Sequence, residues 1–111
     1  MAKVDLLLLS GLTASDGSIV ASGATLKFDT EFVAARTDVR ITPKLYRNRE
    51  LFESGYTSIW ISEQTIPNSF VISFAVDDFY VLTPLKLYEE VGNWLNNYMG
   101  GDYFELKIIE E

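Results

Sequence analysis

TPLKLYEEVGNWLNNYMGG, residues Thr83–Gly101, carries the strongest helix pattern of this 111-residue chain. Thr83 can accept a hydrogen bond from an amide of the first turn, and Pro84 fits the first helical position because it has no N–H to lose. Gly100 and Gly101 supply a left-handed stop. One half of the helical wheel is apolar (Leu85, Leu87, Tyr88, Val91, Trp94, Leu95, Tyr98 and Met99), and the other half is polar (Lys86, Glu89, Glu90, Asn93, Asn96 and Asn97). The stretch therefore predicts an amphipathic helix that lies on a sheet.

The rest of the chain shows the short alternating patterns of β-strands. The expected strands are Lys3–Leu9, Ile19–Ala21, Ala24–Val33, Val39–Leu45, Thr57–Glu63, Phe70–Val76 and Tyr103–Ile109, with Phe79–Leu82 leading into the helix. Asn48 can cap one helical turn that ends at Gly55. We expect an α+β, mostly β fold. It is an antiparallel sheet or β-sandwich-like domain with one C-terminal amphipathic helix packed on it, and residues 1–111 form a single domain.

The composition excludes the commonest catalytic tools, because the chain has neither cysteine nor histidine. The acidic pairs Asp77/Asp78 and Glu89/Glu90 could serve a hydrolase or a hard cation. Neither pair has the spacing of a calcium loop, and no nucleophile stands beside a base. We expect no enzyme, no cofactor, no metal and no small-molecule substrate. The formal net charge of −7 disfavours nucleic acid as a partner, and no segment predicts a membrane span or an export signal.

Trp60 is the most informative single residue. Strand alternation places it on the polar face with Ser58 and Ser62, opposite Ile59 and Ile61. An outward tryptophan favours an interface anchor or a sugar-stacking platform. The alternative is a side chain covered by a neighbouring loop or by the helix.

Charge divides along the chain, and this division suggests contact surfaces. Five of the nine basic residues fall in one stretch, namely Arg36, Arg40, Lys44, Arg47 and Arg49. That stretch can meet an acidic surface of the next subunit, make a small nucleic-acid contact, or remain solvated. The outer face of the helix carries Glu89, Glu90, Asn93 and Asn97 and is its expected electrostatic complement, within the subunit or between subunits.

Three segments in the first half of the chain resemble a small virion protein of tailed bacteriophages. They are LSGLTASDGS (Leu9–Ser18), SGATLKFDT (Ser22–Thr30) and ITPKLYRNRELFESGY (Ile41–Tyr56). The resemblance is to short all-β or α+β proteins from the structural gene blocks of gut crAss-like phages. It implies a multi-copy building block of head, neck or tail, located in the virion after assembly in the host cytoplasm. It supplies no catalytic residues.

These observations together predict a non-enzymatic structural or assembly protein whose partners are itself or other virion proteins. The alternative is a monomeric binding module for carbohydrate or protein that uses exposed aromatic side chains such as Trp60, Tyr46 and Tyr56.

Overall fold

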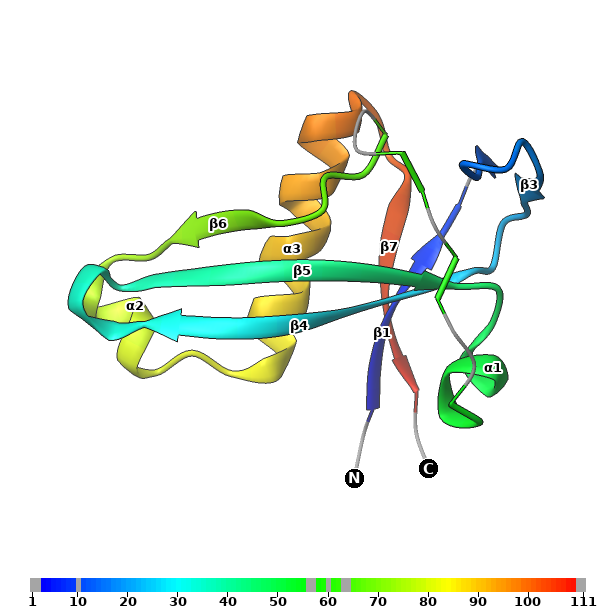
Figure 1. The fold of residues 1–111 in the computed structure, drawn as a ribbon. Coiled ribbons are helices and arrows are strands. Elements are labelled where there is room, and N and C mark those ends of the chain that lie inside the picture. The colour runs from blue at the N-terminus through cyan, green and yellow to red at the C-terminus, as the bar shows by residue number, and fades with distance from the viewer. Residues whose placement is uncertain (1–2, 10, 56–57, 60, 63–64, 110–111) are drawn as a thin grey trace.

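The computed structural model describes residues 3–9, 11–55, 58–59, 61–62 and 65–109 (Figure 1). Within these ranges the strands are β1 (Lys3–Leu8), β2 (Leu12–Thr13), β3 (Ile19–Val20), β4 (Thr25–Val33), β5 (Asp38–Tyr46), β6 (Phe70–Ser73) and β7 (Phe104–Ile109). The helical segments are the 3₁₀ turn η1 (Ala34–Arg36) and the α-helices α1 (Arg49–Glu53), α2 (Val76–Tyr80) and α3 (Pro84–Met99). An antiparallel sheet of order β6-β5-β4-β1-β7 and a separate β2–β3 pair make up the described strands. The predicted α+β fold with a mostly antiparallel sheet is confirmed.

The five-stranded sheet consists of two parts joined by a short seam. β4 and β5 pair over nine residues, and β1 and β7 pair over six. The strand register between β1 and β4 covers just two described pairs, Leu6–Leu26 and Leu7–Thr25. Figure 1 shows the consequence, because β1 and β7 run steeply across the direction of β4 and β5. The two parts therefore diverge on either side of the seam.

The register gathers the apolar side chains on one face of the sheet. Leu6 stands opposite Leu26 and Leu106, and Leu26 stands opposite Leu45. Leu6, Leu26 and Leu45 are all buried in the core. Helix α3 adds Leu87, Val91 and Leu95 to the same core. The β2–β3 hairpin contributes Leu12, Ala14 and Val20.

Both predicted ends of the long helix are confirmed. The Thr83 hydroxyl accepts a hydrogen bond from the Lys86 amide at 3.2 Å, and Pro84 occupies the first turn. Gly100 ends the helix with φ 79°, a left-handed conformation that glycine adopts without steric cost. The apolar face differs slightly from the prediction, because Leu85 and Tyr98 are largely exposed.

Gly92 brings α3 close to β1. A Cβ atom built on Gly92 would lie 2.9 Å from Cδ2 of Leu6, a side chain that is itself buried. Glycine in a helix interior costs about 1 kcal/mol in propensity relative to alanine. At this position it allows the close packing of α3 against Leu6.

Replacing Gly92 by alanine is expected to lower the free energy of unfolding by about 1 kcal/mol. Crowding of a packed core costs about 1–3 kcal/mol, which outweighs the gain of about 1 kcal/mol in helix propensity. Asn93→Ala is the matched control, since Asn93 is the next residue and is exposed; it should gain a few tenths of a kcal/mol. Urea denaturation compares the two, and equal stabilisation by both would contradict the close contact.

The prediction for residues 74–82 is wrong. The strand predicted for Phe70–Val76 ends at Ser73, and Val76–Tyr80 forms helix α2, which takes in the first half of the segment Phe79–Leu82 expected to lead into the long helix. Asp77 and Asp78 stand in the first turn of α2, where carboxylates interact favourably with the positive end of the helix dipole. Phe79 buries its ring and attaches the helix to the end of β4.

Two expectations for the sheet are only partly met, and one expected helical turn is confirmed. Of the strand predicted for Thr57–Glu63, Ile59 forms a single bridge with Leu45, while Thr57, Trp60 and Glu63 lie outside the described residues. The short turn after Asn48 is confirmed as α1, with the Asn48 side chain accepting from the Leu51 amide at 2.8 Å. Among the described strands, β2 and β3 alone form a second sheet, so the sandwich-like part of the prediction is not confirmed.

Candidate functional site

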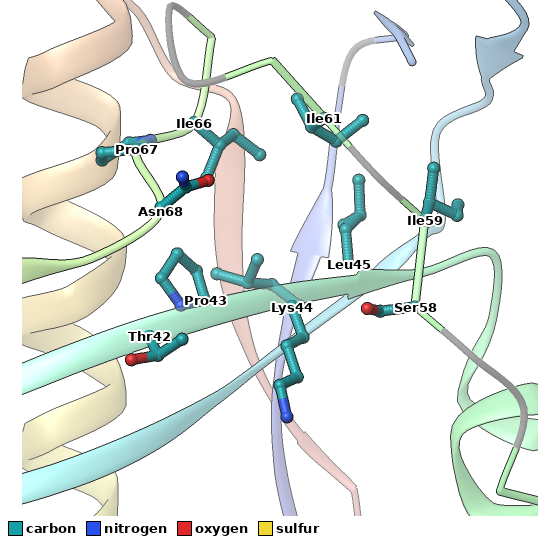
Figure 2. Close-up of a pocket in the computed structure, with 11 residues that line it drawn as sticks. Thr42, Pro43, Lys44, Leu45, Ser58, Ile59, Ile61, Ile66, Pro67 and Asn68 are labelled. Carbon is teal, nitrogen blue, oxygen red and sulfur yellow. The ribbon is translucent and has the colours of Figure 1, made fainter. Parts of the chain in front are cut away.

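An apolar hollow opens beside β5, between residues 42–45 and the described residues 58–59, 61 and 66–68 (Figure 2). Its volume is about 420 Å³, which lies within the range of about 300–1,000 Å³ that is usual for binding pockets. The lining is mostly apolar (Leu26, Pro43, Leu45, Ile59, Ile61, Ile66 and Pro67), and four polar residues complete it (Thr42, Lys44, Ser58 and Asn68). We call this space the hollow. In Figure 2 the Lys44 side chain stands at its rim and extends away from the segment 58–68.

The hollow exists because β5 loses its neighbour part-way along one edge. β6 pairs with β5 up to Ile41, and the next described contact on that edge is the Ile59 amide donating to the Leu45 carbonyl at 2.7 Å. The N–H and C=O of alternate residues face the same edge of an antiparallel strand. Pro43 therefore faces the gap together with Leu45, and as a proline it offers no N–H there. The gap presents apolar walls and is poorly suited to pairing with an added strand.

An apolar knob protrudes at the far end of β4, around helix α2. Phe32, Val76, Tyr80 and Val81 are 56%, 59%, 68% and 73% exposed. Val76 and Tyr80 are four residues apart and share one side of α2. The Phe79 ring beneath them contacts Phe32 at 6.1 Å and Tyr80 at 5.2 Å between ring centroids. We call these four exposed residues the knob. Figure 1 shows α2 at the end of the molecule remote from β1 and β7.

A buried carboxylate lies at the seam between the two parts of the sheet. Asp5 is 0% exposed and accepts hydrogen bonds from Lys27 Nζ and from Arg49 Nη1. Lys27 Nζ also donates to the Val4 carbonyl at 3.3 Å and lies 5.0 Å from the centre of the Phe52 ring. The cluster joins β1, β4 and α1 where the strands diverge. Arg49 also pairs with Glu53 at 2.7 Å, so the two cations of the cluster are balanced by two carboxylates. We therefore assign the cluster to the stability of the fold.

The basic residues predicted as an interface have local partners in several cases. Lys44 donates to Asp29 at 2.7 Å, which raises the pKa of Lys44, and Arg40 stands opposite Glu31 in the register of β4 and β5. Arg49 pairs with Glu53 and Asp5, and its pKa is raised chiefly by the hydrogen bond to Glu53. Arg36 and Arg47 are exposed. Two of the five residues, Lys44 and Arg49, therefore balance charge within the subunit.

The acidic side of α3 is also paired locally. Lys86 lies 3.0 Å from Glu90 and 3.9 Å from Glu89, and the hydrogen bond to Glu90 is the main cause of the raised pKa of Lys86. No ion pair joins Glu89 or Glu90 to the basic stretch within the part of the chain that the structure describes. Within the described residues, Glu89 and Glu90 therefore lie beside Lys86 on the same helix. A contact between subunits stays a prediction.

The three asparagines of α3 have different roles. Asn93 and Asn97 are exposed, as predicted. Asn96 was expected on the same polar face, but its Oδ1 accepts from the amides of Tyr103 and Phe104, at 3.0 and 2.8 Å. Its Nδ2 donates to the Phe104 carbonyl at 3.0 Å. Asn96 therefore fixes the start of β7 to the end of α3.

Sequence reasoning missed the knob, the hollow and Asp5, and only Asp5 left a signal. Asp5 is an acidic residue inside the otherwise apolar run from Val4 to Leu9, which indicates a buried and paired carboxylate. Val76 and Tyr80 are four residues apart, and residues at that spacing share one face in a strand as well as in a helix, so they did not reveal the knob. The hollow left no signal, because its walls come from segments far apart in the sequence. Trp60, the strongest predicted anchor, lies outside the described residues.

Comparison of the chain with protein-family models, curated proteins and solved structures returned no match. The described helices include none that is long and apolar enough to cross a membrane. No group of three or more potential metal ligands occurs among the described residues.

Proposed function

We propose that this chain is a non-enzymatic assembly protein that acts through contacts between subunits. The observation that supports the proposal is the presence of two unlike apolar surfaces, the knob at the α2 end of β4 and the hollow beside β5. Exposed apolar side chains grouped in one place are typical of a surface that another protein covers.

The knob supports an interface in particular because of its composition. Aromatic side chains are enriched where proteins bind one another, and Phe32 and Tyr80 are both more than half exposed. Phe79 holds them from below, so the surface is organised before any partner arrives. A preorganised surface loses less conformational entropy on binding.

The wider setting of the proposal comes from the resemblance of the first half of the chain. The resemblance implies a protein present in many copies in the virion of a tailed bacteriophage, with itself and other virion proteins as partners. In such a particle the open polar face of the sheet would be covered by a neighbouring subunit. We propose that the sandwich-like layering expected from the sequence arises in that way.

Size-exclusion chromatography with light scattering tests the proposal over a series of protein concentrations. We expect the mass to rise with concentration above the 12.5 kDa of one chain. Apolar contacts persist in salt, whereas contacts made by surface charges weaken, so the association should remain at high ionic strength. A chain that stays monomeric at every concentration and salt level contradicts the proposed function.

The alternative is a monomeric binding module, and the hollow is the observation that favours it. A space of about 420 Å³ with apolar walls suits a small apolar ligand. The carbohydrate version is less well supported, because Tyr46 packs its ring against Phe52 at 5.1 Å between centroids. Titration with a panel of apolar ligands and oligosaccharides distinguishes the two. Saturable binding by a strictly monomeric chain would favour the module.

A further inference from the structure

We infer that the knob of one copy inserts into the hollow of the next, so that copies of this chain associate head to tail. This inference rests on the proposed function and names the partner for both surfaces. The occupant of the hollow is a second copy of the chain. Three features of the described residues support this choice, namely the shape of the hollow, the charges beside each surface, and the positions of the two surfaces on the molecule.

The hollow is suited to side chains presented by a compact element. Pro43 faces the gap without an N–H, so a peptide strand added at this edge would lack a backbone donor opposite it. A partner would therefore bind the hollow mainly by burying apolar side chains against its apolar walls. Helix α2 supplies what such a site accepts, because Val76 and Tyr80 project from one side of a short helix.

The charges beside the two surfaces are of opposite sign. Asp77 and Asp78 are exposed and flank the knob on α2. Lys44 lines the rim of the hollow. Lys44 is paired with Asp29, but both side chains are exposed, and such surface pairs contribute little to stability. Docking of the knob would bring carboxylates toward this ammonium, which favours the correct orientation of the two copies.

The positions of the surfaces exclude a contact within one chain. The hollow uses β5 residues that pair with Leu26–Asp29, whereas the knob includes Phe32 at the other end of β4. The part of β4 beside the hollow, from Leu26 to Asp29, lies three to six residues from Phe32, which is roughly 10–20 Å at the rise of a β-strand. A contact between two different surfaces is heterologous, so it leaves one knob and one hollow free after each step. Copies can therefore continue to add, giving a ring or a filament.

Mixing two variants tests the inference. The knob variant carries Tyr80→Ser and Val81→Ser and keeps an intact hollow. The hollow variant carries Ser58→Trp, which fills the hollow and leaves the knob intact; Asn68→Trp at the rim replaces it if that protein fails to fold. Ile19→Ser is the matched control, because Ile19 is 72% exposed and belongs to neither surface. Circular dichroism confirms that each variant is folded.

Sedimentation velocity then measures the size of each species. We expect the wild type and Ile19→Ser to associate beyond the dimer, and each interface variant alone to stay monomeric. An equimolar mixture of the two variants should form a dimer and stop there, because a single intact knob–hollow pair remains. Interface variants that associate like the wild type overturn the head-to-tail contact, and so does a mixture that stays monomeric. Neither result contradicts the proposed self-association as long as the wild type associates. A wild type that stays monomeric overturns the proposed function itself.

Discussion

Replacing Asp5 by alanine lowers the free energy of unfolding by about 3–5 kcal/mol, the usual cost of removing one partner from a buried ion pair. Asp5 is 0% exposed and is the shared acceptor for Lys27 and Arg49. Without it, two cations that are mostly buried face each other at the seam between β1 and β4. Their mutual repulsion and lost hydrogen bonds add to the cost of keeping them out of water.

Asp29→Ala is the matched control for Asp5→Ala. Asp29 also pairs with a lysine, but its side chain is 70% exposed, so its removal should change stability by at most about 1 kcal/mol. Urea denaturation measures both variants. If Asp5→Ala does not fold, Asp5→Asn serves in its place, since it keeps the volume and one acceptor oxygen. Equal small losses for Asp5 and Asp29 would contradict a structural role of the buried cluster.

Asn96→Ala is expected to lower the free energy of unfolding by about 2–4 kcal/mol. The substitution removes three hydrogen bonds and leaves the Phe104 amide and carbonyl without this partner, whereas the Tyr103 amide keeps its bond to the Gly101 carbonyl at 3.1 Å. Each backbone group left unsatisfied in a buried position costs about 1–3 kcal/mol. The Phe104 side chain is buried beside these groups, so water reaches them poorly.

Asn97→Ala provides the comparison, because Asn97 is the neighbouring residue and is exposed. Alanine is the better helix former by a few tenths of a kcal/mol, so this variant should be slightly more stable than the wild type. Hydrogen exchange of the β7 amides gives a second measurement, in which Asn96→Ala loses protection there and Asn97→Ala does not. Unchanged protection of β7 in both variants would contradict the role assigned to Asn96.

Local signals predicted the elements whose formation depends on neighbouring residues. Thr83, Pro84 and Gly100 define α3 through contacts within its own turns, and Asn48 does the same for α1. The alternation of β4 is visible in the sequence, where Leu26, Phe28 and Phe32 alternate with polar residues, although burial follows it only at the start of the strand and Phe32 is exposed. Such features require only the spacing of residue types along the chain.

Features that depend on distant segments were not predictable. Asn96 has the same residue type as Asn93 and Asn97, and only the position of β7 distinguishes it. Local ion pairs satisfy Lys44 and Arg49, and the sequence could not choose between these partners and the acidic face of α3. α2 was missed because five residues are too few to establish a helix period. The gap beside β5 depends on where β6 begins to pair with it. That position follows from the path of the chain between the two strands, which the sequence pattern does not reveal.

Disulfide trapping between two labelled copies tests the central claim most directly, since the natural chain contains no cysteine. One copy carries Val81→Cys on the knob, and the other, enriched in ¹⁵N, carries Ser58→Cys in the lining of the hollow. A disulfide requires the two Cα atoms to approach within about 7 Å. An Asp16→Cys copy, with its cysteine in an exposed turn, replaces the Ser58→Cys copy as the control. The account predicts that mass spectrometry finds the mixed 58–81 disulfide far in excess of both homodimers and of the 16–81 product. Random yields of all pairs would contradict the knob–hollow contact.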